Sequence, residues 1–225
     1  NLVNKREKAR KTILNSINNL TDYEIQTTKF FTLTAPTGIG KTLSSLQAAL
    51  ILQGRIANIE GYTPRIITAI PFINIIEQNK LEYENVIGAD GRIVVHHRLN
   101  DFSKFKSANE NTPVDKKLME VESWEGDFVL TTFVQLFQSI FTGKNRSLKK
   151  IHKLAGSIVI LDEAQAIPEN YMPIVGAILI ELSKYLGTRF ILMTATQPKI
   201  IDFGNLIIND SNLRIVTLLP DYKDY

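Results

Sequence analysis

The chain has 225 residues, 44% of them hydrophobic and 22% charged, and its formal net charge is +3. This length allows one large domain or two small ones, and the composition is typical of a globular protein with a hydrophobic core. The absence of cysteine excludes disulfides and thiolate metal sites, which agrees with a cytoplasmic location. No run approaches the ~20 apolar residues of a membrane helix, so we expect no membrane contact. The chain starts without Met or a signal-peptide core, and we expect it to be a piece of a longer polypeptide.

The first half of the chain alternates helical and strand patterns. The expected elements are a helix over 1–20, a polar connector over 22–28, a strand from Phe30, a helix from Lys41 to about Leu52, a loop between Gly54 and Gly61, a strand over 65–70, a helix over 73–83 and a strand over 92–97. Residues 98–126 are polar and lack a clear period, so we expect a surface insertion there, with a short helix at 116–121.

The second half continues the alternation. The expected elements are a strand over 128–132, a helix over 133–141, a basic turn over 143–147, a strand over 157–161, a helix over 171–182, and strands over 190–193 and 213–218. Because the strands are apolar throughout and alternate with helices, the sequence predicts an α/β domain with a mostly parallel sheet and helices on both faces. Ligands of such sheets bind at the carboxyl ends of the strands.

Basic residues gather in two segments. The first contains Lys5, Arg6, Lys8, Arg10 and Lys11, and the second contains Lys144, Arg146, Lys149, Lys150 and Lys153. Most such runs are solvated faces of helices, so the two clusters only weakly favour a nucleic-acid partner.

A phosphate loop is predicted where the first strand meets the next helix. Its pattern A-x-x-G-x-G-K-T has alanine where the general form G-x-x-x-x-G-K-[ST] has its first glycine. Gly38 and Gly40 permit torsions that turn N–H groups inward around phosphate oxygens, and the helix dipole adds positive charge. Lys41 is expected to reach the β- and γ-phosphates and the Thr42 hydroxyl to hold Mg²⁺; the alternative is a glycine turn with an exposed lysine. The candidate cofactor-binding residues are Ala35, Pro36, Thr37, Gly38, Ile39, Gly40, Lys41 and Thr42.

An acidic pair directly follows the apolar strand that ends at Leu161. Asp162 is expected to bind Mg²⁺, and Glu163 is expected to orient and deprotonate the attacking water. The alternative is that both carboxylates only cap the next helix. Phosphoryl transfer needs a metal-binding carboxylate that faces the phosphates, which favours the first interpretation.

A third motif, Thr194-Ala195-Thr196, ends a later strand. Its short hydroxyl side chains can hydrogen-bond the acidic motif and couple it to the state of the γ-phosphate. The motif is commonplace on its own, and its value lies in its position after the other two.

In this order the three motifs resemble motifs I, II and III of the superfamily 2 helicases, with Asp162-Glu163-Ala164-Gln165 as a DExH-like motif II. Segments 69–78, 131–137 and 161–168 are similar to the helicase of type I CRISPR interference systems, the helicase–nuclease that the Cascade complex recruits. The resemblance spans roughly residues 30–200. It implies that residues 1–225 form a single RecA-like P-loop domain, the ATP-binding domain of a helicase.

The resemblance also implies roles for residues outside the three motifs. Gln165 would join Lys41 and Glu163 as a catalytic residue, although many relatives have histidine there and glutamine cannot titrate. Motifs Ia and Ib would line the track of a single DNA strand, and polar side chains at helix starts suit its phosphates. These DNA-binding candidates are Pro71, Phe72, Asn74, Gln78, Thr131, Thr132 and Gln135. The residues alone also allow a simpler interpretation, in which Pro71 ends a strand, Phe72 is a core residue and the threonines reflect strand preference.

Several parts of that helicase–nuclease are not found in the sequence. Its HD nuclease needs several His and Asp ligands, whereas the only histidines are His96, His97 and His152, and the first two are expected on opposite faces of a strand. No second RecA-like domain with an arginine finger is found, and loss of such a finger typically costs ~10³–10⁵ in turnover. No adenine-recognising glutamine is identified either.

The sequence therefore predicts the ATP- and Mg²⁺-binding motor lobe of a single-stranded DNA helicase or translocase in type I CRISPR interference, an antiviral defence. In the intact protein the expected partners are single-stranded DNA, a second RecA-like domain, an HD nuclease and a Cascade-type complex. The isolated chain is expected to bind Mg·ATP weakly and to hydrolyse it hardly at all. Two alternatives remain open: the lobe of another superfamily 2 DNA or RNA helicase, and a non-enzymatic interaction module switched by nucleotide.

Overall fold

A seven-stranded parallel sheet forms the centre of the molecule, with the strand order β3-β4-β2-β5-β6-β1-β7. The computed structural model describes residues 2–36, 38–88, 91–96, 121, 123–141, 145–196, 199–220 and 222. The strands are β1 Phe30–Thr34, β2 Ile66–Ile70, β3 Ile93–His96, β4 Phe128–Thr132, β5 Ile158–Leu161, β6 Arg189–Thr194 and β7 Ile215–Thr217. Every residue of the five inner strands is buried, as their continuous apolar sequences predicted.

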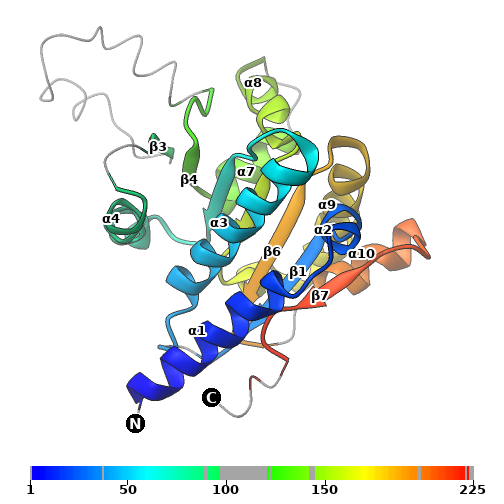
Figure 1. Cartoon of the computed structure of the whole chain (residues 1–225). Coiled ribbons are helices and arrows are strands. Elements are labelled where there is room, and N and C mark those ends of the chain that lie inside the picture. The colour runs from blue at the N-terminus through cyan, green and yellow to red at the C-terminus, as the bar shows by residue number, and fades with distance from the viewer. Residues whose placement is uncertain are drawn as a thin grey trace, which may run out of the picture.

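Helices cover both faces of the sheet (Figure 1), which confirms the predicted α/β class. One core lies under α1 Leu2–Asn18, α2 Asp22–Thr27, α3 Lys41–Glu60 and α4 Ile76–Ile87. The other lies under α7 Phe133–Phe141, α8 Asn145–Leu154, α9 Met172–Leu186 and α10 Ile200–Ile208.

The N-terminal helix α1 runs alongside α3 in the same direction (Figure 1). Its buried stripe of Ala9, Ile13 and Ile17 packs into the first core. Two arginines add polar contacts between the helices: Arg10 Nε donates to Gln47 Oε1 at 2.6 Å, and Arg55 Nη1 donates to the Ile17 carbonyl oxygen at 3.1 Å. The amino end of α1 therefore lies beside the start of α3.

Helices α9 and α10 approach each other closely because two glycines face each other at their contact. A Cβ added to Gly204 would lie 2.2 Å from the backbone carbon of Gly176, and one added to Gly176 would lie 2.0 Å from the carbonyl oxygen of Ile200. No residue with a Cβ fits at either position without displacing a backbone.

Two predicted boundaries near the phosphate loop are wrong. Residues 22–27 form helix α2 instead of a connector, because Thr21 and Glu24 make a capping box in which each residue's side chain bonds the other's backbone N–H. Helix α3 does not end near Leu52 but continues through Gly54 to Glu60. Leu52 and Ile56 are buried on either side of Gly54, and that packing outweighs the roughly 1 kcal/mol that an interior glycine costs a helix.

In the second half, the predicted basic turn over 143–147 is wrong from Asn145 onward, where α8 begins; residues 142–144 lie outside the described part. Helix α10 was not predicted. The insertion at 98–126 and its short helix fall almost entirely outside the described residues, but Trp124 near its end is fully buried in the second core. The end of the predicted insertion therefore belongs to the packed domain.

Candidate active site

The phosphate-loop candidate connects β1 to α3 at the carboxyl edge of the sheet. The backbone N–H of Ala35 donates to the Thr194 carbonyl oxygen at 3.1 Å, which ties the start of the loop to the end of β6. Gly38 and Gly40 have φ angles of 81° and 86°, a left-handed region that favours glycine. Gly40 precedes the first residue of α3. Thr37 lies outside the described residues.

Lys41 meets the acidic pair. Its Nζ lies 3.3 Å from Glu163 Oε1, although the two residues are far apart in the chain. The lysine side chain is only 7% exposed, and its ammonium has no hydrogen-bond geometry to any described residue. The contact is thus an ion pair without a well-directed hydrogen bond. A buried lysine is the opposite of the exposed turn lysine that was the alternative.

Asp162 is buried at the end of β5, and its backbone N–H donates to the Ala69 carbonyl oxygen at 2.9 Å. Burial, with a smaller contribution from the neighbouring Glu163 carboxylate, raises the pKa of the Asp162 carboxyl to about 6, and the Lys41 ammonium partly opposes both effects. The Lys41 ammonium thus compensates the burial of this carboxylate only in part, and a bound cation would supply further positive charge.

Glu163 has a left-handed backbone with φ 52°, which is uncommon for a residue other than glycine. Its carboxylate accepts a hydrogen bond from Gln165 Nε2, and Gln165 Oε1 accepts one from the Ala195 N–H at 3.4 Å. Nearby, the Thr194 hydroxyl donates to the Thr196 carbonyl oxygen. The acidic motif and the third motif are therefore linked through Gln165, the candidate that takes the place of a histidine.

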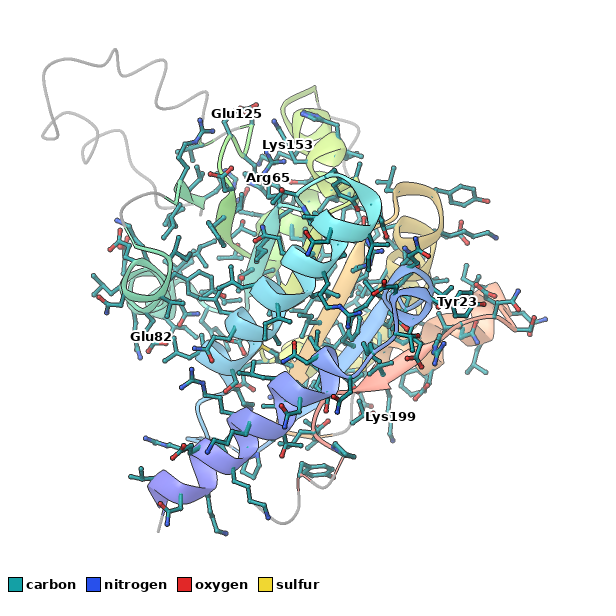
Figure 2. All side chains as sticks on the ribbon, viewed as in Figure 1. Tyr23, Arg65, Glu82, Glu125, Lys153 and Lys199 are labelled. Carbon is teal, nitrogen blue, oxygen red and sulfur yellow. The ribbon has the colours of Figure 1, made fainter. Side chains whose placement is uncertain are left out.

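The strand order explains why these motifs meet. Strand β6 lies between β1 and β5, and parallel strands end at the same edge of the sheet. The phosphate loop, the third motif and the acidic pair follow β1, β6 and β5 respectively. Figure 2 shows the two ends of the strands. Lys199, which follows β6, lies toward the carboxyl ends, whereas the ion-paired Glu125 and Lys153 lie at the amino ends.

The residues present fit a nucleotide and a divalent cation. A Cβ added at Gly38 or at Gly40 would meet no atom within 4 Å, so the space beside the loop is open. A buried cationic lysine and a buried carboxylate of raised pKa border that loop. Among the described residues no group of three or more His, Cys, Asp or Glu side chains could hold a metal by itself. Mg²⁺ is usually bound through one or two carboxylates together with substrate phosphates, and Asp162 would provide such a carboxylate.

The motif Ia candidates follow β2 and are largely accessible. Phe72 is 62% exposed, and Asn74 and Gln78 are exposed beside it. Phe72 and the half-buried Pro71 also line an apolar groove with side chains of α7 and α9. Phe72 is therefore not the core residue of the simpler interpretation.

The motif Ib candidates are less accessible. Thr131 is buried, and its hydroxyl donates to the His96 carbonyl oxygen at 2.9 Å. The Thr132 hydroxyl accepts from the Gln135 N–H at 3.3 Å, at the start of α7. Both hydroxyls make contacts within the fold, and any role of these threonines toward DNA stays a prediction.

One contact to the phosphate loop was not predicted from the sequence. Arg6, assigned to a solvated basic face, donates from Nε to the Gly38 carbonyl oxygen at 2.7 Å. No spacing rule connects a residue of α1 to a loop more than thirty positions later, so only the packing of α1 on α3 reveals it.

Within the described part of the chain, no helix combines the length and the apolar character needed to span a bilayer.

Comparison with known proteins places the chain among helicases. The model of the DEAD/DEAH box helicase family matches residues 9–203. The chain is 35% identical over 211 residues to the CRISPR-associated nuclease/helicase Cas3 of Haloferax volcanii, an alignment that covers 89% of this chain and 22% of that protein.

Solved structures show the same fold. The crystal structure of T. fusca Cas3 with ADP has a TM-score of 0.61 at 20% identity and covers 88% of this chain and 22% of that one. The DUF1998 helicase MrfA bound to DNA and AMPPNP has a TM-score of 0.56 at 18% identity and covers 92% of this chain and 28% of that one. The chain therefore spans between about a fifth and somewhat more than a quarter of the length of these relatives.

Proposed function

Because the chain belongs to the DEAD/DEAH box helicase family, we propose that it is the ATP-binding motor lobe of a helicase that translocates on single-stranded DNA. The observation that carries this proposal is the ion pair between Lys41 and Glu163, 3.3 Å apart. It brings the phosphate loop and the acidic pair to one place, which ATP hydrolysis requires and a plain glycine turn does not.

Each residue of the site then has a separate task. Lys41 would exchange its carboxylate partner for the β- and γ-phosphate oxygens, and the loop N–H groups would hold the same phosphates. Asp162 and the Thr42 hydroxyl would hold Mg²⁺, whose chemistry when bound is to neutralise charge on the phosphate oxygens. Glu163 would accept the proton of the attacking water, and Gln165 would orient that carboxylate through the hydrogen bond from its Nε2.

The third motif would report the state of the site to the rest of the molecule. Ala195 donates its N–H to Gln165 Oε1, and Gln165 in turn contacts Glu163, so a shift of Glu163 changes the end of β6. The second RecA-like domain of the intact protein would detect this change and supply an arginine finger. Without that domain we expect turnover well below about one per second, the lower range of complete phosphoryl-transfer enzymes.

The role in type I CRISPR interference rests on the likeness to Cas3 of Haloferax volcanii. We propose on this basis that the intact protein acts with an HD nuclease and a Cascade-type complex in the cytoplasm. The accessible Phe72, Asn74 and Gln78 after β2 support a nucleic-acid track along this edge. Stimulation of the intact ATPase by single-stranded DNA but not by single-stranded RNA would support DNA as the track.

Replacing Glu163 by glutamine tests the hydrolytic role directly. Glu163→Gln keeps the shape of the side chain but removes the base, so we expect unchanged Mg·ATP affinity and a loss of turnover of about 10²-fold or more. Calorimetry with Mg·AMPPNP measures the affinity, and phosphate release by the intact protein with single-stranded DNA measures the turnover.

Lys41→Ala is the companion variant, and we expect it to lose binding itself. Unaltered turnover in Glu163→Gln would contradict the assignment of Glu163 as base. Nucleotide binding without turnover in the unchanged intact protein would favour a nucleotide-switched interaction module. Unaltered binding in Lys41→Ala would contradict the phosphate loop altogether.

A further inference from the structure

One side chain of α1 reaches the phosphate loop from outside the family's matched region. Arg6 Nε donates to the Gly38 carbonyl oxygen at 2.7 Å, and Arg6 lies before residues 9–203, which the DEAD/DEAH box model matches. Both residues are exposed, so the hydrogen bond itself lies outside the buried core.

The contact determines the direction of one N–H group in the loop. The peptide bond between Gly38 and Ile39 is trans, since the described residues contain no cis bond. In a planar trans peptide the C=O and the N–H point in opposite directions. A guanidinium that holds the Gly38 oxygen on the side of α1 therefore directs the Ile39 N–H to the opposite side.

Glycine makes such a restraint necessary. Gly38 has φ 81° and no Cβ, so rotation of the adjoining peptide plane meets little steric resistance. On its other side the plane is held by the Ile39 side chain, which is 4% exposed and packs in the first core. The arginine and the buried isoleucine together select one of the orientations that glycine allows.

The helix that carries Arg6 is itself well fixed. Ala9, Ile13 and Ile17 are buried against the first core, and Arg10 Nε donates to Gln47 Oε1 on α3 at 2.6 Å. Because α1 is anchored by these contacts, the backbone of Arg6 is held independently of the loop. The Arg6 side chain can therefore position the loop.

We propose that Arg6 is a positioning residue for nucleotide binding: it holds the Gly38–Ile39 peptide so that the Ile39 N–H is available to the phosphates. This inference rests on the proposed function, because a nucleotide is the ligand whose phosphates the loop would bind. It adds a contribution from α1 to a loop otherwise explained by its own sequence.

The test compares two arginines of the same helix. Arg6→Ala removes the contact to the loop, whereas Arg10→Ala removes a contact of similar length to α3 and leaves the loop alone. Calorimetry of the whole chain with Mg·AMPPNP and with Mg·ADP should show both nucleotides weakened about three- to tenfold by Arg6→Ala, the size expected for an exposed charge-assisted hydrogen bond. Arg10→Ala should stay within about twofold of the unchanged chain, and Arg6→Lys should recover part of the loss.

Three results would overturn the inference while leaving the proposed function intact. Unchanged affinity in Arg6→Ala would show that the contact does not matter. An equal loss in Arg10→Ala would assign the effect to docking of α1. A loss confined to Mg·AMPPNP would indicate a direct contact to the γ-phosphate instead of an oriented peptide. Absence of nucleotide binding by the unchanged chain would overturn the proposed function, and this inference with it.

Discussion

At the scale of single residues, the buried Asp162 carboxylate lowers the stability of the folded protein at neutral pH. Burial next to Glu163 raises the pKa of Asp162 from its ordinary value near 3.8 to about 6. Between these two values the folded protein binds more protons than the unfolded chain, so this carboxyl makes stability fall as the pH rises through that window. At neutral pH this decrease in the free energy of unfolding is complete. Residues needed for function often lower stability in this way.

Removing the charge should therefore stabilise the protein. We expect Asp162→Asn to raise the free energy of unfolding by about 1–3 kcal/mol at pH 7.5 without magnesium, and by roughly half as much at pH 5, where the native carboxyl is largely protonated but the unfolded one is not. Urea unfolding at the two pH values measures this. Glu169→Gln, at an exposed carboxylate, is the control and should change stability by less than about 0.5 kcal/mol. A destabilised Asp162→Asn at both pH values would contradict the argument.

The sequence predicted the chemistry of the site residues better than their contacts. Lys41 and Asp162 follow strand ends in recognisable motifs, so their place at one edge of the sheet could be predicted. The hydrogen bond from Thr131 to the His96 carbonyl could not, because it depends on which strand lies next to β4. Arg6 was missed for the same reason, since helix packing and not local spacing brings it to Gly38.

At the scale of elements, α9 and α10 pack closely where Gly176 and Gly204 face each other. We expect Gly204→Ala to destabilise the protein by about 2–4 kcal/mol or to prevent folding, because the added methyl meets a backbone that cannot yield. Thermal unfolding by circular dichroism, with the yield of folded protein, measures the effect.

Gly54→Ala is the matched control, because Gly54 lies inside α3 and an added Cβ there has no atom within 4 Å. This change should stabilise the protein by about 0.5–1 kcal/mol, because alanine loses less backbone entropy than glycine when the chain folds into a helix. Equal effects of Gly204→Ala and Gly54→Ala on stability would show that the α9–α10 contact has room for a Cβ and does not require glycine.

The errors at this scale have identifiable physical causes. The signal for α2 was present, since Thr21 and Glu24 have the spacing of a capping box, but the segment was too short and polar to show a period. For α3, Gly54 was weighted as a helix stop, whereas the buried residues on both sides of it continue the helix. Local propensity is a weak guide where tertiary packing decides.

At the scale of the whole molecule, nucleotide binding should be visible as added stability. A ligand at about 100 times its Kd stabilises the folded state by about 2.7 kcal/mol, which for a chain of this size raises Tm by about 5–10 °C. We expect this shift with Mg·AMPPNP, a smaller one when EDTA removes magnesium, and none in Lys41→Ala. Differential scanning fluorimetry measures it, with Arg10→Ala as a variant that should keep most of the shift. An equal shift in Lys41→Ala would place the nucleotide elsewhere.

The parallel sheet and its two helical layers could be predicted from apolar strands that alternate with helices. The order of the strands could not, because their patterns are nearly interchangeable and the order is decided by how the crossovers pack. The three-residue β7 is short and partly exposed, so its pairing with β1 at the sheet edge leaves little trace in the sequence.

The direction of α1 has a practical consequence for work with this protein. Because α1 runs parallel to α3, its first turn lies on the same side of the molecule as Gly38, and Leu2 precedes Arg6 by only about 6 Å along the helix axis. A purification tag joined before Leu2 would lie near the phosphate loop and could interfere with ligand binding. A fluorophore attached at the same place would be close enough to report that binding. The neighbourhood of Glu125, at the far edge of the sheet, is the better place for a silent label (Figure 2).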